Sequence, residues 1–456
     1  MFSEKLSAKV NIILLPLTII LVIACSVANA QTTTAPDERV TLTIKQQGII
    51  LDSLYMALDS IYVYPEKAAE TIKTLKKNFK DGKYKDLIDP DAFAQRITED
   101  MYEICHDGHL GLHYAAGLEP YDAGSNEPSE EEKAQYLTEK KFENFRFEKL
   151  ERLPGDIGYL KFNQFVDASI AGATAIASMN WLANSEALII DLRENHGGSP
   201  SMIQLISSYF FDEVEHLNSF YIRTTDSYEQ YWTQAYVCGP RMSNIPIYVL
   251  TSHATFSGAE EFSYNLKNMK RAVIVGETTG GGAHPVDDIR FASLDMLARM
   301  PYGKAINPIS GTNWEGTGVT PDYEISADSA LEFAQILALD TLIKTATKPG
   351  KLEVFKWTYD DMKALREPFD LSQELINKYV GDYNPRRIFL EDGQLYYQRG
   401  DNPKHKMIPM SEDTFVFDDL DYFRLKIEMD KDGNPVAAVG LYQGGNTDRC
   451  TRIDKR

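Results

Sequence analysis

Three short segments of the chain carry residue types that could form a hydrolytic site. In "TSHATFSGAEEF" (251–262), Ser257 stands between a β-branched run and an amphipathic helical pattern, directly before Gly258. A hydroxyl exposed at a turn from strand to helix can act as a nucleophile. The free N–H groups of a helix start favour negative charge, and Gly258 would offer an unhindered N–H to an oxyanion. A structural interpretation competes, because Ser257 and Glu260 also form a capping-box pattern.

The second segment, "DLRENHGGSPS" (191–201), places Gly197 and Gly198 between an expected buried strand and an expected helix. Two glycines at such a turn can bring backbone N–H groups close to a ligand. An ordinary tight turn would show the same pattern. Asp191 and Arg193 are expected to be structural, as a charged pair at a strand end usually bonds locally.

The third segment, "CHDGHLGLH" (105–113), contains His109. A serine nucleophile needs a base, and the ordinary pKa of histidine suits that task near neutral pH. The chain has eight histidines, so His109 by itself could equally be a core or surface residue. The sequence contains no CxxC or HExxH motif and gives no indication of a metal site or another cofactor.

The pattern around these segments predicts the elements that must position them. Over 146–350, apolar strands alternate with helical stretches, which indicates an α/β core with mostly parallel pairing. Apolar spacings of three and four predict an N-terminal helical domain over 40–115. The acidic stretch 116–145, rich in Gly, Pro and Ser, is expected to be a linker or loop. Short alternating strands predict a small antiparallel β domain over 367–456.

The bulk composition narrows the class of protein. The chain has 456 residues and a net charge of −20, which argues against a nucleic-acid partner.

Residues 1–30 have the form of a signal peptide. Two interpretations are favoured there: cleavage after Ala30, or lipidation of Cys25, which would then give the membrane contact. Either way, we expect an exported protein, periplasmic or extracellular. An uncleaved anchor helix is a third interpretation, disfavoured because Pro16 interrupts the apolar run. Three further cysteines are too few for a disulfide framework.

Taken together, the segments resemble the tail-specific (carboxyl-terminal processing) serine peptidases, most closely the interphotoreceptor-retinoid-binding-protein-like and tricorn-like branch. The resemblance covers roughly residues 45–345 and implies a ClpP/crotonase-like α/β core. The matching stretches are "DGHLGL" (107–112), "GYLKFNQF" (158–165), "LIIDLRENHGG" (188–198), "VLTSHATFSGAEEFSYNLKNMKRAVIVGETTGGGAHP" (249–285) and "GTNWEGTGVTPD" (311–322).

The resemblance also implies roles for individual residues. It makes Ser257 the nucleophile and assigns the oxyanion hole to the backbone N–H groups of Gly198 and Gly258. Gly197 would shape the turn that presents them. No cofactor is implied.

The general base is the point where branches of the family differ. In the processing proteases a lysine about 25 residues after the serine is the base, and this sequence has Gly282 there. The tricorn-like members use a histidine before the core and a glutamate after it, which correspond to His109 and Glu315. A carboxylate that orients an imidazole works as in a Ser–His–Asp triad. Gly108 replaces the hydroxyl residue that this branch has before its histidine.

The sequence thus predicts an exported serine peptidase that cleaves peptide or protein substrates through an acyl-enzyme. Fewer than fifty residues separate His109 from Gly158, too few for the PDZ domain that many family members insert there. Two alternatives remain: a non-catalytic protein that binds an apolar ligand such as a retinoid or fatty acid, and a hydrolase of non-peptide esters or amides. Neither the substrate nor the oligomeric state can be predicted.

Overall fold

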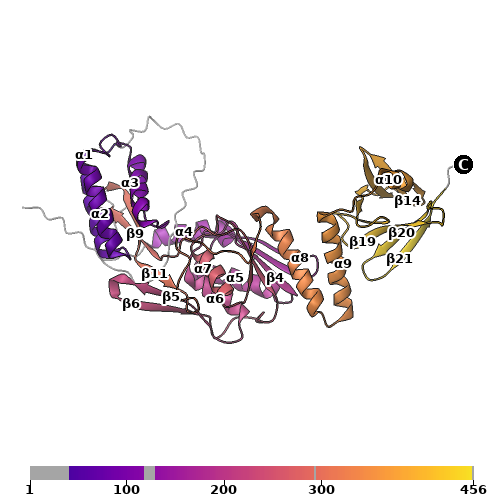
Figure 1. The fold of residues 1–456 in the computed structure, drawn as a ribbon. Helices are drawn as coiled ribbons and strands as arrows, with labels where there is room; N and C mark the ends of the chain where they lie inside the picture. Colours follow the sequence, from indigo (N-terminus) through magenta and orange to yellow (C-terminus); the bar gives the residue numbers. More distant parts are fainter. Residues whose placement is uncertain (1–40, 118–128, 292–293, 454–456) are drawn as a thin grey trace, which may run out of the picture. The chain divides into compact units, whose positions relative to one another are not determined.

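The computed structural model describes residues 41–117, 129–291 and 294–453 (Figure 1). The chain divides into two compact units. One comprises the chain up to Leu150 with Leu160–Ala183 and Ile190–Ala330, and the other comprises Glu151–Tyr159, Asn184–Ile189 and the chain from Leu331. The predicted signal peptide and Cys25 lie outside the described residues. Within the described ranges, no helix is long and apolar enough to cross a membrane.

Three helices follow one another at the start of the described chain: α1 (Ile44–Ile61), α2 (Pro65–Lys80) and α3 (Pro90–Cys105). Their starts carry recognisable signals, since Thr43 caps α1 in a capping box and a proline begins each of the other two. Their buried apolar residues form one core cluster. The predicted helical character of this region is therefore confirmed.

A three-stranded antiparallel sheet completes this region, in the order β1 (Gly111–Tyr114), β10 (Met296–Pro301), β9 (Val286–Phe291). Leu112, Met296 and other apolar residues of these strands belong to the same core cluster as the helices, and Figure 1 shows β9 beside α1–α3. Two of the strands come from far along the sequence. The sheet therefore brings the segment that follows α3 next to the segment that precedes β9.

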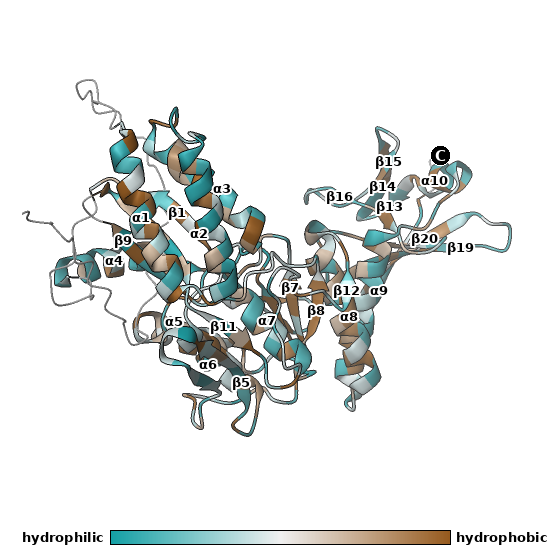
Figure 2. Ribbon diagram, turned by 60° about the vertical axis from the view of Figure 1, so that its left-hand side comes forward, coloured by the Kyte–Doolittle hydropathy of each residue, from teal (hydrophilic) through white to brown (hydrophobic). Residues whose placement is uncertain are grey.

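A six-stranded sheet carries the other site elements, in the order β12-β8-β7-β4-β3-β2. Its strands are β2 (Phe147–Leu153), β3 (Ile157–Phe162), β4 (Ala187–Asp191), β7 (Ile247–Thr251), β8 (Val273–Gly276) and β12 (Tyr323–Glu324). Strands β4 and β7 are buried along their whole length, and Figure 2 shows β7 and β8 as hydrophobic. Strand β8 pairs in parallel with both β7 and β12. The predicted mixed α/β character is confirmed.

Helices follow three of these strands along the chain: α5 (Ala168–Leu182) after β3, α6 (Pro200–Ser207) after β4 and α7 (Gly258–Asn268) after β7. The turns that lead into α6 and α7 meet, because the N–H of Phe256 donates a hydrogen bond of 3.1 Å to the C=O of Asn195. The diglycine turn and the serine turn of the sequence therefore lie at one edge of the sheet.

The segment expected to be a linker or loop contains a helix, α4 (Glu130–Phe142). Ser129 starts it through a capping box: its hydroxyl accepts from the N–H of Glu132, whose carboxylate accepts from the N–H of Ser129. Three glutamates in the first turn suit the positive end of the helix dipole. The acidic composition suggested a loop, but from residue 130 on these acidic residues belong to a helix that faces solvent.

The remaining strands form three antiparallel sheets. Near the site the order is β11-β5-β6, and toward the C-terminus the orders are β13-β14-β15-β16 and β17-β18-β19-β20-β21. Their bounds are β5 (His216–Ile222), β6 (Ser227–Trp232), β11 (Gly303–Ile306), β13 (Gly381–Tyr383), β14 (Arg386–Glu391), β15 (Gln394–Arg399), β16 (His405–Lys406), β17 (Ile408–Pro409), β18 (Thr414–Val416), β19 (Phe423–Met429), β20 (Pro435–Tyr442) and β21 (Thr447–Thr451). The helices α8 (Ala327–Thr345), α9 (Pro349–Arg366) and α10 (Gln373–Tyr379) precede the last two sheets along the chain. Cys105, Cys238 and Cys450 are free thiols.

Candidate active site

Ser257 occupies a strained position immediately before α7. Its backbone has φ 53° and ψ −120°, a region that residues with a side chain rarely adopt. The N–H of Ser257 donates to a carboxylate oxygen of Glu260 at 2.8 Å, and the N–H of Glu261 bonds to its C=O at 2.9 Å. The helix start therefore holds the serine in a sharp turn between β7 and α7, as a nucleophile at such an elbow requires.

The diglycine turn packs directly against this serine turn. Gly197 and Gly198 have φ values of 95° and 138°, where glycine is favoured. A β-carbon on Gly197 would lie 2.5 Å from the backbone nitrogen of Gly258 and 2.8 Å from the Ser257 β-carbon, and one on Gly258 would lie 2.9 Å from the Gly198 nitrogen. Only glycines allow this approach. The structure brings all four predicted residues of the nucleophile and oxyanion hole together.

His109 lies in the loop between α3 and β1 and packs against the serine turn. Its ring packs at a tilt of 38° against Phe256, the residue before Ser257, with 4.7 Å between the ring centroids. A β-carbon on Gly282 would lie only 2.6 Å from the His109 Cε1. His109 is 8% exposed, and its Nδ1 has no hydrogen-bond partner among the described residues. Burial, aided by the charges of His284 and Arg299 and opposed by Asp107, lowers the pKa of His109 to about 4.

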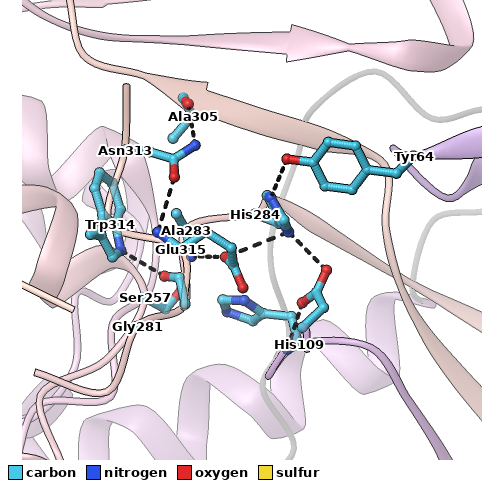
Figure 3. A network of polar contacts seen from close by, with 12 residues as sticks. Tyr64, His109, Ser257, Gly281, Ala283, His284, Ala305, Asn313, Trp314 and Glu315 are labelled. Carbon is cyan, nitrogen blue, oxygen red and sulfur yellow. Dashed lines mark hydrogen bonds and ion pairs between the residues drawn. The ribbon is translucent and has the colours of Figure 1, made fainter. Parts of the chain in front are cut away.

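Glu315 approaches from the loop after β11, opposite the ring of His109 (Figure 3). One of its carboxylate oxygens, Oε2, accepts the N–H of Ala283 at 2.6 Å, and the other, Oε1, is buried without a partner in the described part of the chain. A ring nitrogen of His109, a carboxylate oxygen of Asp107 and one of Glu315 all lie within 4.8 Å of one another. The predicted His109 and Glu315 are therefore neighbours.

A second histidine, which the sequence analysis did not single out, connects the two acids. His284 Nδ1 bonds to Asp107 Oδ2 at 2.8 Å and lies 3.5 Å from Glu315 Oε2, while its Nε2 meets the Tyr64 hydroxyl at 3.3 Å (Figure 3). Burial opposes a charge on this ring, but the hydrogen bond and charge of Asp107 raise the pKa of His284 above its ordinary value. Burial, with the charge of Asp107, raises the pKa of Glu315. Because both carboxylates face His284, the cluster favours an imidazolium between them.

Glu260 joins the serine turn to the loop that touches His109. Its buried carboxylate accepts hydrogen bonds from the backbone N–H groups of Ser257, Gly281 and Gly282, at 2.7–2.9 Å, and from the Thr279 hydroxyl. The capping pattern that the sequence showed is thus one part of a larger bonding network. The network fixes Gly282 relative to Ser257.

Asp191 and Arg193 lie beside the site and have the structural role predicted for them. The Arg193 guanidinium donates to both carboxylate oxygens of Asp191, at 2.9 and 2.6 Å, and to the C=O of Ala327 at 2.6 Å. The pair fixes the end of β4, from which the diglycine turn departs.

Comparison with known proteins gives a family for this region. Residues 156–325 match peptidase family S41. The chain is 28% identical over 180 residues to a carboxy-terminal-processing protease from Bartonella bacilliformis, covering 38% of this chain and 40% of that protein. It is 30% identical over 174 residues to carboxyl-terminal-processing peptidase 2, chloroplastic, from Arabidopsis thaliana, covering 37% of this chain and 32% of that protein. The chain thus spans two-fifths or less of the length of these curated relatives.

A solved structure of the photosystem II D1 C-terminal processing protease is also similar, at 16% identity and a TM-score of 0.40, with 62% of this chain and 94% of that chain covered.

The family match and the curated relatives thus support a serine-type peptidase over residues 156–325. This region matches peptidase family S41, and the resemblance to the tail-specific peptidases is confirmed over it. Ser257, the diglycine turn and Glu315 fall inside the matched range, whereas His109 precedes it.

Proposed function

We propose that this chain is a serine peptidase that hydrolyses peptide bonds through an acyl-enzyme on Ser257, with His109 as general base. The observation that carries the proposal is the position of Ser257 in a strained turn at the start of α7, packed against Gly197 and Gly198. A serine that acted only as a helix cap would need neither the strained backbone nor the diglycine turn.

In the proposed reaction, Ser257 Oγ attacks the substrate carbonyl while its proton passes to His109. The tetrahedral oxyanion accepts hydrogen bonds from the backbone N–H groups of Gly198 and Gly258. His109 then gives the proton to the departing amine, and water hydrolyses the acyl-enzyme by the same path in reverse. The pKa of His109, lowered to about 4, keeps the ring neutral near pH 7, the state in which it can accept a proton, and also makes it a weaker base than an ordinary histidine.

Glu315 is proposed to orient and stabilise His109. The Nδ1 of His109 and the Oε1 of Glu315 are both buried without a partner among the described residues, and a buried polar atom without a partner is costly. A hydrogen bond between the two residues in the substrate complex would satisfy both atoms. It would also stabilise the imidazolium that forms as Ser257 attacks.

The surroundings of His109 act in both directions on this step. Asp107 favours the His109 imidazolium, whereas burial and the charges of His284 and Arg299 oppose it. The proposed mechanism therefore assigns stabilisation of the imidazolium in the transition state to Asp107 and Glu315.

A fluorophosphonate probe tests the nucleophile. We expect the wild type to be labelled and Ser257→Ala to lose labelling completely. Ser252→Ala is the matched control, because Ser252 lies in the same turn but its hydroxyl bonds to the C=O of Arg193; it should keep labelling. Labelling that survives in Ser257→Ala would refute the assignment.

Digestion of a peptide library by the wild type and by Ser257→Ala tests the substrate class. Cleavage by the wild type alone would establish a peptidase. A labelled wild type that cleaves esters but no peptide would instead indicate a hydrolase of non-peptide substrates. If the wild type neither reacts with the probe nor cleaves, the proposal is wrong and a binding protein for an apolar ligand is favoured.

We also infer export from the form of residues 1–30. The intact mass of the mature N-terminus separates the two processing routes: cleavage after Ala30 leaves an unmodified Gln31, whereas lipidation leaves a diacylglyceryl group on Cys25. An N-terminus that still begins at Met1 would contradict both.

A further inference from the structure

The cluster beside Ser257 contains the donor atoms of a metal site. A ring nitrogen of His109, a carboxylate oxygen of Asp107 and one of Glu315 lie within 4.8 Å of one another. Asp107 and His109 come from the loop after α3, and Glu315 from the loop after β11. Imidazole and carboxylate are ligands that Zn²⁺ and similar transition-metal ions accept, commonly three from the protein with water in the fourth position.

Two of these donors lack hydrogen-bond partners among the residues that the structure describes, which distinguishes the cluster from an ordinary salt-bridge network. His109 is 8% exposed and Asp107 is 1% exposed. The Nδ1 of His109 and the Oε1 of Glu315 are each buried without a hydrogen bond among the described residues. A lone pair on each is therefore available to a ligand that enters the cluster.

The charges favour a cation of more than one charge. Asp107 and Glu315 place two carboxylates in a buried site, and His284 supplies a single positive charge between them. Such charges interact more strongly there than in water. A divalent ion would neutralise the negative charges of both carboxylates, whereas the single positive charge of His284 neutralises one.

Hydrogen bonds to neighbouring groups also hold the two carboxylates, as they hold the ligands of established metal sites. Asp107 Oδ2 accepts from the Tyr62 hydroxyl at 3.2 Å and pairs with His284 Nδ1 at 2.8 Å, while Oδ1 accepts the N–H of His109 at 3.0 Å. Glu315 Oε2 accepts the N–H of Ala283. These contacts hold both carboxylates in place and leave Oε1 of Glu315 without a hydrogen bond among the described residues.

We propose that Asp107, His109 and Glu315 form an inhibitory site for a divalent transition-metal ion of the Zn²⁺ type. A metal bound to a ring nitrogen of His109 would occupy a lone pair that the ring uses in proton transfer. Glu315, bound to the same metal, could no longer orient the ring. The inhibitory part rests on the proposed function, whereas the binding part does not. Mg²⁺ and Ca²⁺ fit poorly, because they require six or more ligands that are mostly oxygen.

Binding is tested on full-length Ser257→Ala protein, freed of metal with a chelator and titrated with Zn²⁺ by calorimetry. We expect one ion to bind per chain. In the same background, Glu315→Gln and His109→Gln should each weaken binding by about tenfold or more, the scale seen when the support of a metal site is removed. Melting temperatures measured without zinc show that each variant is folded.

The control is His253→Ala. His253 lies in the serine turn with a side chain that is 78% exposed, and its nearest acidic partner is Glu277 at 3.8 Å. It should bind zinc as the parent does. Equal affinity in the parent, Glu315→Gln and His109→Gln would overturn the site, and so would loss of binding in His253→Ala alone.

Inhibition is tested with the wild type and the fluorophosphonate probe. Zn²⁺ should block labelling, a chelator should restore it, and Mg²⁺ at the same concentration should have no effect. Zinc binding to Ser257→Ala, together with a wild type that the probe never labels, would support the metal site and refute the peptidase. Labelling that Zn²⁺ leaves unchanged at saturation would overturn the inhibitory role.

Discussion

Gly282 lies in contact with the ring of His109. A β-carbon at this position would come within 2.6 Å of the His109 Cε1 and 2.2 Å of the Phe256 Cζ. The family branch that uses a lysine base carries it at the corresponding position of the sequence. In this chain a side chain there is excluded as long as His109 packs against Phe256, so a lysine base and the present position of His109 are mutually exclusive.

Gly282→Ala should therefore damage catalysis by displacing His109. We expect kcat/KM for a cleaved peptide to fall by about a hundredfold, the scale associated with a misplacement of about 1 Å. The three atoms nearest to the added β-carbon all belong to Phe256 and His109. The Phe256 ring is the other group that must move, so the melting temperature should fall as well.

Gly350→Ala is the control for this substitution. Gly350 lies at the start of α9 with no atom within 4 Å of its would-be β-carbon, and like Gly282 it does not have positive φ. Its kcat/KM should match the wild type. Full activity in Gly282→Ala would show that His109 does not need its present position.

Gly197→Ala tests the oxyanion hole. The added methyl group would meet the backbone nitrogen of Gly258 at 2.5 Å, so the two turns must separate. We expect kcat to fall by about 10²–10³, as on removal of one oxyanion donor, with a smaller change in KM.

Gly311→Ala separates this effect from backbone strain. Gly311 also has positive φ, at 68°, but its would-be β-carbon has nothing within 4 Å. It should lose some stability and keep its kcat. An equal loss of kcat in both variants would mean that strain, and not the approach of the two turns, is responsible.

The nucleophile and oxyanion turns could be predicted from sequence because each is encoded locally. A buried strand, a turn with glycine and an amphipathic helix recur at 187–207 and at 247–268, and turns that follow neighbouring strands of a sheet meet at one edge. His109 could not be assigned in this way. Its selection depended on the family resemblance, since nothing in the local spacing separates it from the other histidines.

Asp107 and His284 could not be paired from sequence at all. They are 177 residues apart. They meet because β1 joins β10 and β9 in one sheet, and no local sequence pattern predicted that sheet. Helix α4 is a different case. Its capping signal at Ser129 and Glu132 is local, but the segment is also rich in the acidic residues, Gly, Pro and Ser that are typical of loops.

His284→Gln should shift the acid limb of the pH profile. In the wild type, the pKa of His109 is lowered to about 4, chiefly by burial and in part by the positive charge of His284. The acid limb of kcat/KM, which reports the base of the free enzyme, should therefore lie well below the ordinary histidine value of about 6.5. Removing the cation favours the His109 imidazolium, so the limb should move to higher pH.

The measurement is kcat/KM from pH 4 to pH 8 for the wild type, His284→Gln and the exposed His253→Gln. A purely structural role of His284 would lower kcat/KM at every pH without moving the limb. A limb that stays in place, or that moves to lower pH in His284→Gln, would contradict the electrostatic argument. His253→Gln should reproduce the wild-type profile.

Glu260→Gln should destabilise the protein although it changes only one atom of the side chain. All four groups bonded to this carboxylate are donors, including the Thr279 hydroxyl, which itself accepts the N–H of Val319. A glutamine would turn its NH₂ toward one pair of donors and leave them unsatisfied. We expect a loss of about 1–3 kcal/mol for each such group, measured by urea unfolding at pH 7.

Glu261→Gln, one residue further along α7, should have the opposite effect. Burial raises the pKa of Glu261 to about 8, so the folded protein keeps this acid protonated at pH 7 while the unfolded chain ionises it above about 4.5. Between these values the folded state binds the extra proton, and the free energy of unfolding therefore falls as pH rises. Glutamine mimics the neutral acid in both states and removes that penalty. The measurement is urea unfolding at pH 5 and pH 7. The free energy of unfolding of the wild type should fall between the two pH values, that of Glu261→Gln should fall less, and the variant should be the more stable protein at pH 7. Parallel changes in both proteins would mean that Glu261 is ionised in the fold.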